Sequence, residues 1–241
     1  SGASTSFGVA ESNFLGKGIK LNSNISLSEE SIRGLFSYTK ENYKNSNKDL
    51  IFSLQSQEVD RLKNFGYKTS DTGFLVGTNF EYREDLFFSP QISFNLESLE
   101  TSSDASALLK KQEGSYQNLD FVYSFFLDKR DKSFQTTDGY YSRFSQTLPV
   151  ITEDSQTVVN IYELKNFHEY INDQIISVGI FLSAANSFGD DDVRISDRLY
   201  LPSSKLRGFE SGRIGPLDNG DFVGGNYASS FNAQANLPLL Q

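Results

Sequence analysis

Hydrophobic and polar residues alternate along most of this chain. The segment 18–28 illustrates the pattern, with apolar side chains separated by polar ones at Ile19, Leu21, Ile25 and Leu27. Successive side chains of a β-strand point to opposite faces, so each such segment is predicted to be a strand with one apolar and one polar face. Helical spacing of apolar residues is not sustained over any useful length. The fold is therefore predicted to be all-β.

About eleven segments carry the alternation, and their lengths are near the roughly 9–11 residues that a tilted membrane strand needs. Their expected bounds are 4–12, 18–28, 31–39, 49–58, 71–82, 86–98, 116–128, 139–149, 156–170, 174–186 and 223–237. Short connections (13–17, 82–85) alternate with long polar ones (100–115, 188–222), as in outer-membrane barrels with tight periplasmic turns and long external loops. Pro90 lacks a ladder donor, so a bulge or a strand end is expected there.

Alternation alone does not distinguish a membrane barrel from a water-soluble sandwich or small barrel whose apolar face is turned inward. Two observations favour the membrane. The polar face is rich in Asn, Ser, Gln and Gly, which suits a water-filled lumen. The apolar face carries many of the 21 Phe and 12 Tyr, several of them near strand ends, where aromatic girdles lie. We predict an antiparallel transmembrane β-barrel whose apolar side chains meet lipid.

Composition excludes several other classes. The net charge of -9 argues against nucleic-acid binding, which needs a basic face. No apolar run approaches the roughly 18 residues of a membrane helix, and the mean hydropathy of -0.41 is compatible with a barrel, whose lumen is polar. The absence of Cys removes disulfides and thiolate metal sites and suits an oxidising periplasm. The absence of Met indicates a processed chain or an excised piece.

Three short motifs stand in order after the long polar connection. They are Leu206-Arg207-Gly208-Phe209, then Gly215-Pro216, then Gly224-Gly225-Asn226 at the start of the last expected strand. This order resembles the sixth external loop and the twelfth strand of BamA-type outer-membrane assembly factors, which belong to the bacterial surface antigen superfamily.

A second group of residues resembles the turn between the eighth and ninth strands of the same family. It consists of Asp128, Arg130 and Asp131, followed by Thr137 and Gly139 before an expected strand. The family usually has Pro where Thr136 stands, and we expect this replacement to loosen the turn.

The resemblance implies that residues 1–241 form an incomplete outer-membrane barrel domain. Ser1 would lie in the first external loop, and the eleven strands would correspond to family strands 2–12 of sixteen. The family's first strand, its last four strands and its periplasmic repeat domains are expected to lie outside this chain. The external loop 188–222, with its RGF motif, is expected to fold back into the lumen.

The same resemblance assigns roles within this loop. In the family, acidic residues of the barrel wall hold the Arg of the motif, because a guanidinium in a narrow lumen needs a planar acceptor. Arg207 would be that residue, Gly208 would let the backbone pass close to the wall, and Phe209 would pack against lumen side chains. The family's acidic partner falls at Gln234, which lies on the polar face but has no charge. Without the resemblance, Arg207 reads as an ordinary solvated arginine.

No catalytic, metal or cofactor site is expected. Asp190-Asp191-Asp192 could ligate calcium, but such sites need oxygens spaced along the loop, and a solvated acidic loop is the simpler interpretation. Gly224-Gly225 precedes no helix and is not a phosphate cradle. His168 is the only histidine, and no nucleophile motif accompanies it.

The implied function involves no bond chemistry: it is the folding and insertion of other β-barrel proteins in the bacterial outer membrane. The expected partners are the lipid bilayer, client barrel proteins and accessory assembly lipoproteins. The family's first and last strands open sideways and offer an edge to client strands. Because both lie outside this chain, the chain alone is not expected to insert clients. The alternatives are a related translocator for autotransporter assembly or two-partner secretion, a passive porin and, less favoured, a barrel hydrolase.

Overall fold

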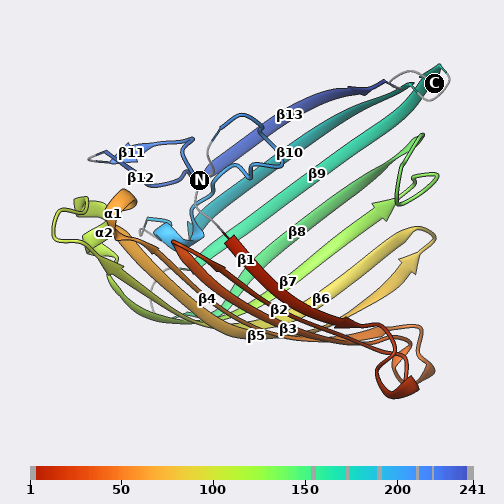
Figure 1. The fold of residues 1–241 in the computed structure, drawn as a ribbon, viewed down its shortest axis with the longest axis horizontal. Coiled ribbons are helices and arrows are strands. Elements are labelled where there is room, and N and C mark those ends of the chain that lie inside the picture. The colour runs from red at the N-terminus through yellow and green to blue at the C-terminus, as the bar shows by residue number, and fades with distance from the viewer. Residues whose placement is uncertain are drawn as a thin grey trace.

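One antiparallel sheet dominates the computed structural model, which describes residues 4–152, 156–171, 174–188, 192–209, 212–218 and 220–237. Eleven long strands follow one another in the order β1 to β10 and then β13. Their bounds are β1 Ser4–Glu11, β2 Ile19–Ser28, β3 Ser31–Lys40, β4 Asp49–Arg61, β5 Tyr67–Arg83, β6 Leu86–Thr101, β7 Gly114–Asp128, β8 Gly139–Thr152, β9 Gln156–Ile171, β10 Gln174–Phe188 and β13 Tyr227–Asn236. The sheet curves into an open trough whose edge strands are β1 and β13 (Figure 1).

Short elements occupy the connections: η1 Phe14–Gly16, η2 Tyr43–Asn45, α1 Leu62–Phe65, α2 Ala107–Lys111, η3 Ile195–Asp197, β11 Leu217–Asp218 and β12 Asp221–Phe222. In the part of the chain that the structure describes, no helix is both long and apolar enough to cross a membrane. The all-β, antiparallel fold predicted from the alternation is confirmed.

The positions of the strands are confirmed as well, with differences at their ends. The last strand does not begin at 223: Gly225 forms an isolated bridge with Leu199, and β13 starts at Tyr227. The connection after β10 therefore runs through residues 189–226 and is called the long loop below. Pro90 marks neither a bulge nor a strand end. It pairs with Tyr123 of β7, while the β5–β6 ladder skips it and continues in the same register.

The apolar face of the sheet points away from the long loop. Glu163, Ser177 and Asn232 lie on the opposite, inner face and line a cavity together with loop residues. Their strand neighbours on the outer face stay exposed, as Val178 and Phe231 illustrate, the latter at 69 %. Apolar side chains that no protein atoms cover are expected where strands meet hydrocarbon.

Most of the buried apolar residues gather at one end of the trough rather than along it. Connections 62–66 and 102–113 meet the long loop there, at the end where Figure 1 shows α1, α2, β11 and β12. The cluster consists of Tyr67, Leu99, Ala105, Leu109, Ile195 and Val223. The long loop is thus packed into a small hydrophobic core that caps this end.

The sequence predicted tight turns at one end of the barrel and long loops at the other, and the structure shows this difference only in part. The capped end has the long connections 102–113 and 189–226, but the turn between β2 and β3 at the same end is only residues 29–30. The opposite end carries short turns and also the ten-residue turn 129–138.

Candidate functional site

The first part of the long loop docks on the inner face through a buried arginine. The Arg194 side chain is almost fully buried, and its residue is 7 % exposed. Its Nη2 donates a hydrogen bond to Asn118 Oδ1 at 2.8 Å, and its Nε lies 3.6 Å from Asp197 Oδ2. The guanidinium also stands over the ring of Tyr116, with 4.7 Å from Cζ to the ring centroid. Arg194 therefore binds this loop to β7.

The wall around Arg194 is acidic. Asp71 of β5 pairs in register with Glu97 of β6, and Asp120 of β7 lies on the same face. Arg194 interacts electrostatically with Glu97 and Asp120, and the Ser196 hydroxyl bonds the Glu97 carboxylate. A buried cation among carboxylates compensates charges that would otherwise be left unpaired. The sequence offered one signal for this residue, an arginine between the apolar Val193 and Ile195.

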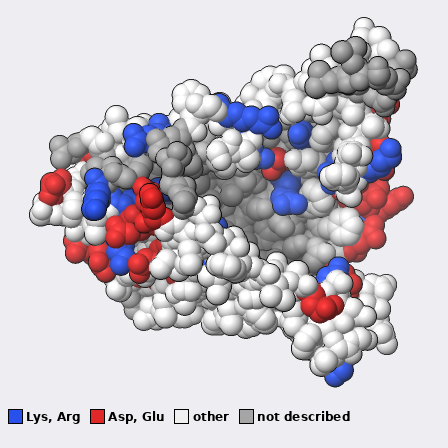
Figure 2. Space-filling view, in the orientation of Figure 1, with Lys and Arg blue, Asp and Glu red and all other residues white. Residues whose placement is uncertain are grey.

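A second part of the loop docks on the strands across the trough. Lys205 Nζ forms an ion pair with Glu163 of β9, and both side chains are largely shielded. The Tyr141 hydroxyl donates to the same carboxylate at 2.7 Å. Asn232 of β13 donates its side-chain amide to the Lys205 carbonyl at 2.9 Å. Figure 2 shows basic side chains around the hollow in the middle of the molecule and acidic ones gathered toward its ends.

Arg207 lies two residues beyond this ion pair. It lines a cavity of about 230 Å³ together with Lys205, Gln234 and Asn232. Among the described residues Arg207 has no ion pair, and the Gln234 amide donates to Asn236 Oδ1 at 3.0 Å. The structure thus brings Arg207 and Gln234 to one cavity, and a contact between them stays a prediction.

Two roles expected for the rest of this motif differ from the geometry. Among the described residues other than its two chain neighbours, none has an atom within 4 Å of the position that a Cβ of Gly208 would take, so close approach to the described wall is not what requires glycine. Its φ of +89° is the reason, because side chains disfavour that conformation. Phe209 is 59 % exposed rather than packed in the lumen. Among the described residues of the long loop, the buried apolar positions are Val193, Ile195 and Val223. Leu206 is half-buried.

The later motifs join the last part of the long loop to residues earlier in the same loop. Val223 N–H donates to the Pro216 carbonyl at 3.1 Å, one residue after Gly215, and Gly225 exchanges two backbone hydrogen bonds with Leu199. A Cβ on Gly224 would come within 3.0 Å of Arg198 and of the Tyr200 ring. The Asn226 carbonyl then accepts from Ala185 of β10 at 2.8 Å.

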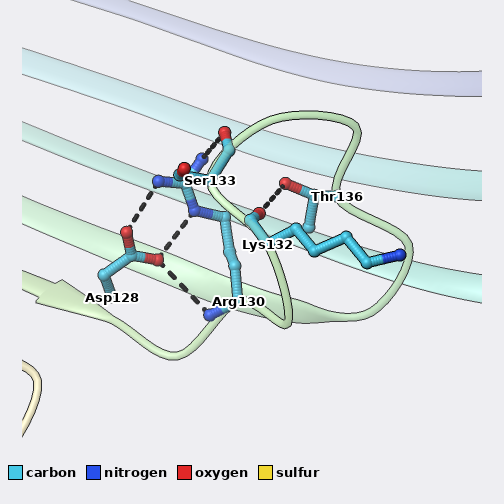
Figure 3. A network of polar contacts seen from close by, with 5 residues as sticks. All are labelled: Asp128, Arg130, Lys132, Ser133 and Thr136. Atoms are coloured by element: carbon cyan, nitrogen blue, oxygen red, sulfur yellow. Dashed lines mark hydrogen bonds and ion pairs between the residues drawn. The ribbon is translucent and has the colours of Figure 1, made fainter.

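The turn 129–138 is held by a network of polar contacts (Figure 3). Arg130 donates from Nε and Nη2 to the Asp128 carboxylate, at 2.7 Å each, and from Nη1 to the Ser133 carbonyl at 3.3 Å. The expectation that Thr136 loosens the turn is wrong. Thr136 is almost buried, and its hydroxyl donates to the Lys132 carbonyl at 2.7 Å, which ties the turn together where Pro could not donate.

The carboxylate of Asp131 closes the same turn. It accepts hydrogen bonds from the Thr137 hydroxyl at 2.6 Å and from the backbone N–H groups of Thr137 and Asp138 at 3.0 and 3.1 Å. These donors, the Thr137 hydroxyl foremost, lower the pKa of Asp131 to about 2. The next residue, Gly139, begins β8 with a φ of +97°.

This depressed pKa predicts how the turn responds to acid. The bonds to ionised Asp131 stabilise the turn at every pH above its ordinary pKa of about 4, and the stabilisation is lost as the pH falls through about 2. We expect the Thr137 and Asp138 amides to keep their hydrogen-exchange protection, corrected for intrinsic rates, from pH 7 to about 4 and to lose it below. Asp131→Asn should remove the acid-dependent loss. Loss of protection in the unsubstituted protein already above about pH 5 would contradict this assignment.

The remaining candidates are His168 and the acidic run at 190–192. His168 Nδ1 lies 3.2 Å from Asp138 Oδ1, with both side chains largely exposed. Of the expected acidic run, 190 and 191 lie outside the described residues. Within the described ranges, no group of three or more His, Asp or Glu residues could hold a metal ion.

Comparisons with known proteins agree with this fold. The chain is 28 % identical over 143 residues to the human Sorting and assembly machinery component 50 homolog, and 28 % identical over 140 residues to the bovine one. The matches cover 57 and 56 % of this chain and 30 % of each relative. The crystal structure of BamA from Haemophilus ducreyi lacking POTRA domains 1-3 superposes with a TM-score of 0.85 at 19 % identity, over 99 % of this chain and 52 % of that one.

This chain therefore spans about half of the BamA structure and less than a third of the curated relatives. A family model, the Omp85 superfamily domain, matches residues 13–241. With its open antiparallel sheet and its inward-folded loop, the chain belongs to the Omp85 superfamily of β-barrel proteins.

Proposed function

We propose that this protein folds and inserts β-barrel proteins into the bacterial outer membrane, without bond chemistry. The observation that carries the proposal is the long loop of an Omp85 superfamily chain, docked inside the trough with Arg207 in the inner cavity. The names of the relatives, a sorting and assembly machinery component and BamA, support it. The exposed apolar outer face supports the lipid bilayer as the surrounding medium.

The partners follow from this proposal. Client barrel strands would add to an exposed strand edge, where backbone hydrogen bonds supply affinity without sequence preference. By the resemblance to BamA-type proteins, that edge would lie on strands other than the eleven described here. The part of the barrel described here would supply a stable wall, and the docked loop would keep the lumen in one shape. Accessory assembly lipoproteins would join at the periplasmic end.

A passive porin is the less favoured alternative, because the cap and the long loop occupy the enclosure that a porin leaves open. The two functions predict different behaviour of the protein with its loop in place and with its loop released. A porin would conduct ions through a wide lumen with the loop intact, and an assembly factor would lose activity when the loop is released.

The decisive measurement uses the full-length protein reconstituted in liposomes. We expect it to accelerate folding of a urea-denatured outer-membrane barrel, followed by the heat-modifiable mobility of the client. Arg207→Ala should lower this rate by about tenfold and increase protease cleavage of the loop, because the proposal gives the Arg207 guanidinium a hydrogen-bonding partner on the wall, which the substitution would remove. Arg33→Ala, an exposed arginine of β3, is the control. A folded full-length protein that does not accelerate the client would refute the proposed function.

A further inference from the structure

Lys205 is held at two points that lie on different strands. Its ammonium group pairs with Glu163 on β9, and its carbonyl accepts a hydrogen bond from Asn232 on β13. Its Nζ also stands 5.5 Å from the centre of the Phe181 ring on β10. Three neighbouring strands thus contact one loop residue, so its position is set relative to the wall rather than to the loop alone.

The segment before Arg207 is also closed by its own backbone. Lys205 N–H and Leu206 N–H both donate to the Pro202 carbonyl, at 2.8 and 3.2 Å. Because these two hydrogen bonds leave few backbone dihedrals free, the position of Lys205 also restricts the positions of the residues that follow it. Arg207 is two residues away in the same cavity.

Residues of the neighbouring strand β8 surround the Glu163 carboxylate. The carboxylate of Glu163 accepts a hydrogen bond from the Tyr141 hydroxyl at 2.7 Å, and Arg143 is paired with Glu163 in the β8–β9 register. Its side chain is 22 % exposed and that of Lys205 is 23 % exposed. A pair that is mostly shielded from water is screened less by solvent than a surface pair.

We propose that Lys205 and Glu163 are positioning residues that set the place of Arg207 in the lumen, a role that rests on the proposed function of the long loop. Neither residue belongs to the motif itself. The pair holds the loop to β9, and Arg207 remains available to an acceptor on the wall. Breaking the pair releases Arg207 without altering it.

Trypsin cleavage after Arg207 in the folded full-length protein tests the position directly. We expect Lys205→Met and Glu163→Gln each to increase the cleavage rate by about tenfold, the change that corresponds to one lost charged hydrogen bond. Lys68→Met is the control, because it breaks an ion pair between β4 and β5 in which Lys68 is about as exposed as Lys205, at 26 %, and its partner Glu58 is more exposed, at 47 %. Equal cleavage in all four proteins would overturn the proposal.

A reversible linker supplies the converse test, since the sequence contains no cysteine. A direct disulfide needs Cβ atoms about 3.5–4.5 Å apart, closer than two long side chains that meet at their tips, so a short bis-methanethiosulfonate linker is used. In Lys205→Cys/Glu163→Cys we expect fast cleavage before linking, slow cleavage after it and fast cleavage after reduction. Lys205→Cys carrying the same reagent at one end controls for steric blocking of trypsin. A linked protein that is still cut rapidly would overturn the proposal.

Client folding distinguishes this inference from the function on which it rests. Linking should restore the folding rate that the reduced double variant loses. A linked protein that is protected but inactive would overturn the positioning role, because the loop would then have to move. A wild-type protein without assembly activity would defeat the proposed function, and the cleavage data would still decide whether the pair places Arg207.

Discussion

Arg194→Met is expected to release the first part of the long loop from the wall. The substitution keeps much of the side-chain volume but leaves Glu97, Asp120 and Asp197 without their shared cation. Removing one partner of a buried charged group costs about 3–5 kcal/mol, and we expect the docked state of the loop to be destabilised by about that amount. The measurement is hydrogen exchange of the amides in 193–199 in the full-length protein, which should become much faster.

The faster hydrogen exchange in Arg194→Met should depend on the acidic residues that surround Arg194. Glu97→Gln in the Arg194→Met background is expected to recover part of the lost protection, because it removes one of the uncompensated charges, and a double-mutant cycle measures this coupling. Arg33→Met, at an exposed position of β3, should leave the exchange of 193–199 unchanged. If Arg194→Met left this exchange as slow as in the unsubstituted protein, Arg194 would not be what binds the loop to the wall.

Gly139→Ala should have the second large effect, on folding of the barrel itself. A Cβ at this position would lie 2.2 Å from the Lys129 carbonyl oxygen and 2.9 Å from Arg130 Cα, both of them backbone atoms that cannot move aside as a flexible side chain could. The φ of +97° adds strain for any residue with a Cβ. Together, the clash and the strain are expected to cost about 3–5 kcal/mol.

Because the turn 129–138 joins β7 to β8, this cost should appear as a lower folded fraction in heat-modifiable electrophoresis and a lower urea midpoint. Gly34→Ala is the matched control, since a Cβ there meets only the Ser56 carbonyl oxygen at 3.9 Å and the residue lies in a regular strand. Equal folded fractions for Gly139→Ala and Gly34→Ala would show that the turn tolerates the contact.

The order of the strands and the two-faced character of the sheet could be predicted from the sequence. Alternation is a local property, and it repeats in every strand, so errors at single residues do not change the result. The turn motif around Asp131 could be found by its resemblance to a family turn, because its residues form one short stretch of sequence: the partners Thr137 and Asp138 lie six and seven residues away. The structure corrected details such as the start of β13 and the role of Thr136, where packing rather than pattern decides.

The sequence by itself therefore determined an antiparallel sheet with one apolar face, and a loop with a recognisable motif. Only the tertiary structure decided that the apolar face points outward and which cations bind the loop. Arg194 bonds Asn118, 76 residues earlier, and Lys205 bonds Glu163, 42 residues earlier. Such contacts depend on the curvature of the whole sheet, which brings distant strands around one lumen, and no local spacing of residues encodes that curvature.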